Sequence, residues 1–150
     1  MNLVEELERT RNETLGFFAL DDEELERQYG PAKWSVRELL HHLSDAETVL
    51  FDRIRRVISE RRPVIWAFDQ DAWARGLGYS DRPLELSRDV YRATRDSIVY
   101  YVKLHYRASA TVEFVHSETG VRTLKDEFEK VALHNEHHLI HIRSALQTVG

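Results

Sequence analysis

Residues 124–148 read LKDEFEKVALHNEHHLIHIRSALQT. Apolar residues recur in this stretch at steps of three and four, the spacing of one face of an α-helix. They include Leu124, Phe128, Val131, Ile142 and Leu146. On a wheel of about 100° per residue centred on Val131, His138 lies about 20° from the centre and His134 about 60°. The stretch therefore predicts a long amphipathic helix with two histidines, four residues apart, on its buried side.

The same periodicity predicts three further long helices in the rest of the chain. They span about residues 2–19 with a short restart at 21–25, about 35–61, and about 83–105. The second follows Gly30-Pro31, and Ser35 with Glu38 predicts a capping box at its start. Four helices of comparable length predict an all-α fold, an up-and-down antiparallel four-helix bundle in which facing helices can build a site.

Two connections stand out between these helices. The segment from Pro63 to Pro83 predicts a long loop between the second and third helices, and loops of that length are commonly lids or binding loops. Its aromatic residues Trp66, Phe68 and Trp73 either wall a pocket or pack the loop down as a minor core. The second connection, residues 111–120, alternates and then turns, which predicts an extended segment.

Composition predicts a single soluble domain over residues 1–150. The length is that of one ordinary domain, and 42% hydrophobic with 31% charged residues is typical of soluble globular proteins. No run approaches the ~18 apolar residues that span a bilayer, and the N-terminus lacks the apolar stretch of a signal peptide. We therefore expect a cytoplasmic protein with no membrane partner.

Charge and cysteine content narrow the classes of function. The formal net charge is -5 and there is no sustained basic run, which counts against a nucleic-acid partner. The chain has no cysteine, which excludes disulfides, thiolate metal ligands and a cysteine nucleophile. Any metal ion must therefore be bound by imidazole nitrogen or by oxygen.

The eight histidines favour such a site, because four of them lie between residues 134 and 141. On the second helix, His42 lies about 60° from the centre of the apolar stripe and His41 about 160° away, so we expect His42 to face inward and His41 to face water. A single inward histidine is more often a hydrogen-bonded core residue than a metal ligand. The His134–His138 pair, however, would need polar partners that the apolar stripe does not obviously supply.

A third imidazole facing an i, i+4 pair would complete a three-nitrogen site for a divalent cation. Three protein ligands leave a position open for water or substrate, as catalytic sites do. Possible helpers are the acids near the histidines and in the long loop: Asp45, Glu47, Glu136, Asp69 and Asp71. The wheel turns Asp45 and Glu136 outward, so we expect both to be solvated. His105 continues the apolar series of the third helix and is expected to be structural or to support a ligand.

Several of these residues also form motifs that resemble a known family. They are Trp34-Ser35 followed by HLSDAE at 42–47, FDQDAW at 68–73, the turn at 116–124, and HNEHHLIHI at 134–142. Over about residues 30–145 the chain resembles the DinB/YfiT-like superfamily of metalloenzymes. The resemblance implies a four-helix bundle with His42, His134 and His138 as metal ligands. His141 stands where the family more often has Gln, and it could orient a ligand, add a fourth nitrogen or cap a carbonyl.

The resemblance also implies a class of function. A divalent metal is expected, either zinc, nickel, iron or manganese, with zinc or nickel favoured. Family members are implied to include metal-dependent hydrolases and transferases or isomerases that use low-molecular-weight thiols, all acting on a small-molecule substrate, and homodimers are common among them. The sequence does not choose between water and a thiol. The alternative is a non-catalytic metal-binding or interaction protein, which a filled coordination sphere would favour.

Overall fold

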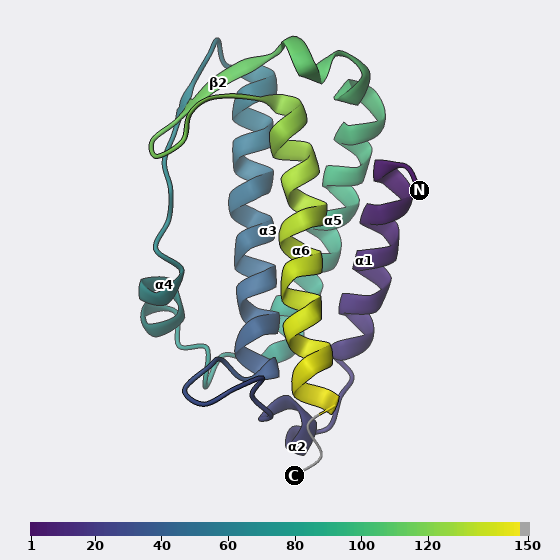
Figure 1. The fold of residues 1–150 in the computed structure, drawn as a ribbon, viewed down its shortest axis with the longest axis vertical. Coiled ribbons are helices and arrows are strands. Elements are labelled where there is room, and N and C mark those ends of the chain that lie inside the picture. Colours follow the sequence, from purple (N-terminus) through teal and green to yellow (C-terminus); the bar gives the residue numbers. More distant parts are fainter. Residues whose placement is uncertain (148–150) are drawn as a thin grey trace.

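Four long helices form the body of the protein (Figure 1). The structure, a computed structural model, describes residues 1–147. The long helices are α1 (Leu3–Phe17), α3 (Val36–Ser59), α5 (Leu84–His105) and α6 (Leu124–Gln147). The predicted four-helix bundle is confirmed. The predicted end of the last helix at Thr148 lies outside the described residues.

Shorter elements occupy the connections. They are α2 (Asp22–Leu25), α4 (Gln70–Gly76), a 3-10 helix (Tyr106–Thr111), and the strands β1 (Val64–Ile65), β2 (Glu113–His116) and β3 (Gly120–Thr123). The capping box at the start of α3 is confirmed: the Glu38 backbone N–H donates to Ser35 Oγ at 3.2 Å, and the Ser35 N–H donates to Glu38 Oε1 at 3.1 Å. The extended segment after the 3-10 helix is confirmed as β2.

The long helices do not alternate strictly in direction, which differs from the up-and-down order that we expected. Hydrogen bonds between α3 and α5 advance in the same direction along both helices, from His41–Ser87 to Glu47–Arg95, so these helices run parallel. Contacts from α3 to α6 run oppositely, from His42–His138 to Arg53–Glu127. The reason is the long connection, which returns along the side of the bundle before α5 begins (Figure 1).

That connection is anchored by a small sheet. β1 pairs parallel with β2, which places Ile65 opposite His116, and β2 pairs antiparallel with β3. The Ser117 N–H donates to the Ile65 carbonyl at 2.8 Å, and Ser117 Oγ accepts from the Ala67 N–H at 2.9 Å. The segment that we expected to be a loop therefore contains a strand and a short helix, and its start is attached to the turn before α6.

The core is divided into two apolar halves by a polar layer. One half includes Leu7, Leu50, Ile54, Ile98 and Phe128, and the other includes Val36, Leu39, Leu43, Leu139 and Ile142. Between them along α3 and α6 lie the buried polar residues Glu47, Asn135 and His138, and His42 joins this layer from the same turn as Leu43. The candidate site belongs to this layer.

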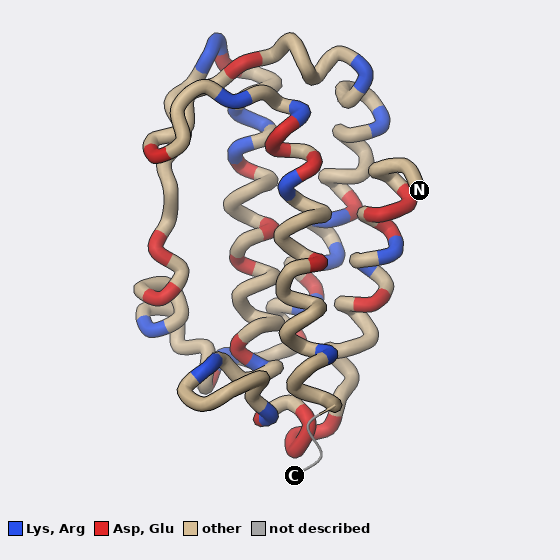
Figure 2. Tube along the Cα trace, viewed as in Figure 1, with Lys and Arg blue, Asp and Glu red and all other residues tan. Residues whose placement is uncertain are grey.

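Charges of both signs are interspersed along the helices rather than gathered into one field (Figure 2). Within residues 1–147, no helix has the length and apolar character needed to cross a membrane.

Candidate metal centre

Three imidazoles meet in the polar layer. His42 extends from α3, and His134 and His138 extend from successive turns of α6. Nε2 of His42 lies 3.1 Å from Nε2 of His134 and 3.1 Å from Nε2 of His138. The antiparallel packing of α3 against α6 thus joins the single histidine to the i, i+4 pair that the wheel placed on the buried face.

The spacing of these nitrogens fits a divalent cation. In a tetrahedral zinc site with Zn–N bonds of about 2.0–2.1 Å, neighbouring nitrogens lie about 3.3 Å apart. A neutral Nε2 offers either one proton or one lone pair, so Nε2 of His42 must serve two neighbours with one group. Nδ1 of His42 and Nδ1 of His138 are buried and have no hydrogen-bond partner within residues 1–147. A cation coordinated by all three rings would remove the conflict at Nε2.

Burial keeps the three rings unprotonated. It is the largest cause that lowers the pKa of His42, His134 and His138 from 6.5 to about 3 in each case. The neighbouring histidines add to the effect, since a second positive charge nearby is unfavourable. At neutral pH all three are therefore neutral bases, the form in which imidazole binds metals.

Aromatic side chains enclose His42 on its other sides. The ring of Trp34 lies 5.0 Å from the His42 ring, and the ring of Phe68 from the long connection lies 6.4 Å away and nearly parallel to it. Phe68 in turn packs on Trp73 at 4.8 Å. These rings limit the access of water to the His42 side of the cluster.

The cluster opens instead through His134 into a groove of about 220 Å³, here called the inner groove. Phe68, His116, Lys130 and Arg53 also line it. His116 was not singled out from the sequence, and pairing of β1 with β2 brings it here. Its Nδ1 accepts from the backbone N–H groups of residues 118 and 119 at 3.1 and 3.3 Å, and burial lowers its pKa. The neutral ring therefore carries its proton on Nε2.

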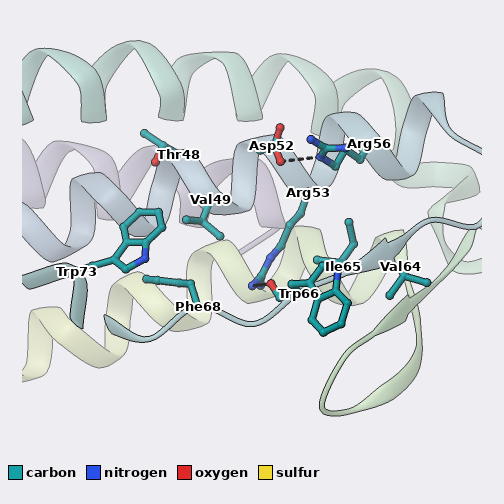
Figure 3. A pocket seen from close by; sticks show the side chains of 10 residues that line it. All are labelled: Thr48, Val49, Asp52, Arg53, Arg56, Val64, Ile65, Trp66, Phe68 and Trp73. Atoms are coloured by element: carbon teal, nitrogen blue, oxygen red, sulfur yellow. Dashed lines mark hydrogen bonds and ion pairs between the residues drawn. The ribbon is translucent and has the colours of Figure 1, made fainter. Parts of the chain in front are cut away.

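A larger groove of about 570 Å³, here called the outer groove, is shown in Figure 3. Arg53 and Phe68 line both grooves. Trp66 and Trp73 line the outer one, with Trp73 beside Phe68 at one end (Figure 3). Trp66 is 74% exposed, so it forms part of an open wall rather than a minor core.

His141 does not join the three converging nitrogens. It forms a second group with His137 and His138, in which His137 is exposed. The His141 ring stacks on Tyr29 at 4.1 Å with an angle of 3° between the planes. Among residues 1–147, no carboxylate and no fourth histidine belongs to the His42, His134 and His138 group.

Two residues that we expected to face water are buried. His41 is fully buried, with Nδ1 at 2.7 Å from Ser87 Oγ, and burial lowers its pKa to about 4. Asp45 accepts from the Tyr79 hydroxyl at 2.7 Å and from Arg82 Nη1 at 3.1 Å. The wheel was wrong for both because Tyr79 and Arg82, which precede α5, pack across that face of α3.

The remaining candidate helpers lie outside the cluster. Glu47 forms a buried ion pair with Arg95, and Glu136 is half-buried and pairs with Arg9 and Arg143. Asp69 is exposed and caps α4 through the N–H groups of residues 71 and 72, and Asp71 is exposed in the first turn of that helix. His105 ends α5 beside Tyr101, with 6.2 Å between ring centroids.

Comparison with known proteins agrees with this architecture. The sequence model of the DinB superfamily matches residues 6–142. The chain belongs to the DinB superfamily. A protein of Oceanobacillus iheyensis, provisionally named a metal-dependent hydrolase, is 33% identical over 131 residues, which cover 85% of this chain and 73% of the relative. A similarly named protein of Halalkalibacterium halodurans is 26% identical over 85% of this chain and 74% of its own length.

Among solved structures, YfiT from Bacillus subtilis superposes on this DinB superfamily member with a TM-score of 0.84. The match covers 95% of this chain and 83% of YfiT at 21% identity. YfiT is described as "a probable metal-dependent hydrolase with an unusual four-helix bundle topology". At this identity the likeness establishes the fold alone.

Proposed function

We propose that this protein is a small-molecule metalloenzyme, a metal-dependent hydrolase, that binds one divalent cation through Nε2 of His42, His134 and His138. The observation that carries the proposal is the convergence of three neutral ring nitrogens beside a groove. The names of its relatives support it. Zinc or nickel is favoured because imidazole suits such borderline cations.

When bound, the cation would supply Lewis acidity, which makes water or a thiol more acidic and a carbonyl more reactive. In this proposal the three histidines bind the cation, the aromatic rings around His42 limit the access of water, and the residues of the inner groove position the substrate. Phe68 and Trp34 shield His42. In the inner groove, Nε2–H of His116 can donate a hydrogen bond to a substrate oxygen, and Lys130 adds positive charge. Glu118 also lines the groove and adds negative charge, so the groove suits a small polar substrate with a carbonyl group.

A thiol-dependent transfer reaction is a second form of the same proposal. Because the chain contains no cysteine, the thiol would come from a low-molecular-weight cosubstrate. The three-ligand arrangement supports catalysis over a structural metal, since structural zinc sites use four protein ligands. Neither His141 nor a carboxylate supplies a fourth ligand among residues 1–147.

The test is an activity screen on protein freed of metal by chelation and reloaded with zinc, nickel, iron(II) or manganese(II). One panel offers esters and amides of small carboxylic acids, and a second offers electrophiles with bacillithiol, mycothiol or glutathione. His42→Ala is the matched inactive variant. Stoichiometric metal without turnover in either panel would favour the non-catalytic alternative.

A further inference from the structure

A second group of histidines adjoins the candidate metal centre and continues along α6 toward the C-terminal end of that helix. It consists of His137, His138 and His141, here called the second histidine group. Each member offers a ring nitrogen, and these nitrogens lie within 4.8 Å of one another. His137 is exposed, His141 is half-buried and His138 is buried. The group therefore extends from the surface to the candidate metal centre, with which it shares His138.

The spacing of the rings in the second histidine group is similar to that in the candidate metal centre. The ring centroids of His42, His134 and His138 lie 5.1, 4.6 and 4.6 Å apart. Those of the second histidine group lie 5.0, 4.6 and 5.6 Å apart. Three imidazoles on one tetrahedral cation, with metal–nitrogen bonds of about 2.0–2.1 Å, have centroids about 5 Å apart. The second histidine group therefore has the ring spacing that a cation requires.

Two nitrogens of this group, Nδ1 of His138 and Nδ1 of His141, are buried and have no hydrogen-bond partner among residues 1–147. Because Nε2 of His138 belongs to the candidate metal centre, Nδ1 is the atom that this ring can offer to a second cation. A histidine that binds a metal through one nitrogen normally donates the N–H of its other nitrogen to an oxygen. The described chain supplies no such acceptor to His138, which favours a cation at Nδ1.

The other two rings are well placed to bind the same cation. His137 and His141 are four residues apart on α6, the spacing at which two imidazoles can bind one metal ion. Tyr29 stacks on the His141 ring at 4.1 Å, which restricts the rotation of that ring. No carboxylate of residues 1–147 belongs to the group, and imidazole donors alone favour copper(II), nickel(II) or zinc(II) over magnesium or calcium.

We propose that His137, His141 and Nδ1 of His138 form a second divalent-cation site. When the cation binds His138, the Nδ1–H bond breaks and its proton goes to solvent. The electron pair of that bond stays on Nδ1 and forms the bond to the metal. With both sites filled, one imidazole ring joins two cations about 6 Å apart. The inference goes beyond the proposed function, and only the sharing of His138 rests on that function.

The second site should bind its cation more weakly than the first. His137 is exposed, whereas His42 is fully buried. Burial, His137 and Lys33, in that order, lower the pKa of His141, so the positive charge of Lys33 is close enough to oppose a cation. We therefore expect the second cation to leave during dialysis and the first to stay.

Calorimetric titration with nickel(II) tests the second site on the full chain freed of metal by chelation. Wild type should bind two equivalents. His141→Gln and His137→Ala should each raise the Kd of the weaker equivalent by about 100-fold or more, because losing even a residue that only orients a ligand costs about 10–100-fold. A single equivalent in wild type, or a weaker equivalent that survives both substitutions, overturns the proposal.

Two control variants accompany this titration, and circular dichroism checks that every variant folds. His105→Gln changes a histidine at the end of α5, outside both groups, and should keep both equivalents. His42→Ala removes a ligand of the first site alone, so it should lose the tighter equivalent and keep the weaker one. If His42→Ala kept the tighter equivalent, the proposed function would be wrong, while the loss in His141→Gln would still support the second site.

Copper(II) tests the sharing of His138. Two copper(II) ions joined by one deprotonated imidazole ring couple antiferromagnetically. The EPR signal per copper should therefore fall at low temperature when the second equivalent is added to wild type. In His141→Gln, which should bind only the first equivalent, the signal per copper should stay complete. A complete signal from wild type with two bound copper ions would overturn the assignment of Nδ1 of His138 to the second cation.

Discussion

Two polar clusters occupy neighbouring turns of the bundle core, and they differ in how their hydrogen bonds are satisfied. Arg95 is fully buried, and all five of its N–H donors have acceptors at 2.6–2.9 Å: Glu47 takes two, and the Leu7 carbonyl, Thr10 and Asn135 take one each. The histidine cluster instead turns three nitrogens toward one another, and its buried Nδ1 atoms on His42 and His138 have no hydrogen-bond partner in the part of the chain that the structure describes.

The difference separates a structural network from a binding site. We call the Arg95 network closed, because each of its donors has an acceptor. Such a network rigidifies the helices that form it and requires no ligand. An open cluster of like groups is unfavourable by itself, because buried polar atoms without partners cost free energy. The cluster becomes favourable when it binds a cation, which accepts the lone pairs of the ring nitrogens. A cation is therefore expected at the histidines and not at Arg95.

The largest expected effect distinguishes the histidines from one another. His138→Ala should abolish stoichiometric binding of the proposed divalent metal, because two imidazoles from different helices cannot replace the third. His137→Ala, which removes an exposed neighbour, should retain it. Elemental analysis after dialysis measures both, and metal retained by the His138 variant would refute the assignment.

The next effect concerns the closed network. Glu47→Ala should lower the free energy of unfolding by about 3–5 kcal/mol, because it leaves the buried Arg95 charge uncompensated. Glu136→Ala, which removes a partly exposed partner of Arg143, should cost about 1 kcal/mol or less. Urea titration measures both. If Glu47→Ala lowered the free energy of unfolding by less than the control variant Glu136→Ala does, the Arg95 network would not have the structural role that we describe.

Acid should destabilise the metal-free protein through the open cluster. The histidines have a pKa of about 3 in the folded chain and 6.5 in the ordinary state, so the unfolded chain binds more protons between these values. Stability should be complete above about pH 6.5 and fall as the pH is lowered toward 3, by at most about 1.4 kcal/mol per pH unit for each histidine. Urea unfolding in chelator at several pH values measures this slope. The slope should be smaller in the His42→Phe variant than in the wild type. An equal slope in the two proteins would argue against buried neutral imidazoles.

The smallest expected effect tests whether the Arg95 network tolerates the loss of one hydrogen bond. Tyr91 donates to Asn135 Oδ1 at 2.5 Å, and that oxygen also accepts from Arg95. Tyr91→Phe should therefore cost only about 1 kcal/mol, because Asn135 keeps one partner. Tyr100→Phe removes an exposed hydroxyl and should leave stability unchanged. A loss for Tyr91→Phe as large as that for Glu47→Ala would show that the network fails as a unit.

Sequence reasoning predicted the parts that depend on local spacing. The Ser35–Glu38 capping box, the bounds of the long helices and the inward direction of His42 and His138 all follow from patterns within one helix. The sequence does contain a pattern that indicates a buried Arg95, which we did not use: this charged residue lies in the apolar series of Tyr91, Ile98 and Val102. His116 left none, because only strand pairing brings it to the groove.

By itself, the sequence determined four amphipathic helices and an i, i+4 pair of histidines on a buried face, because helix geometry repeats every 3.6 residues wherever the helix lies. The tertiary structure alone decided that α3 and α5 run parallel and that Asp45 and His41 are covered, whereas the family resemblance already implied that His42 would meet the pair from α6. These outcomes depend on which distant segments pack together. Such contacts are set by the burial of whole faces and the path of the long connection, and no local pattern encodes them.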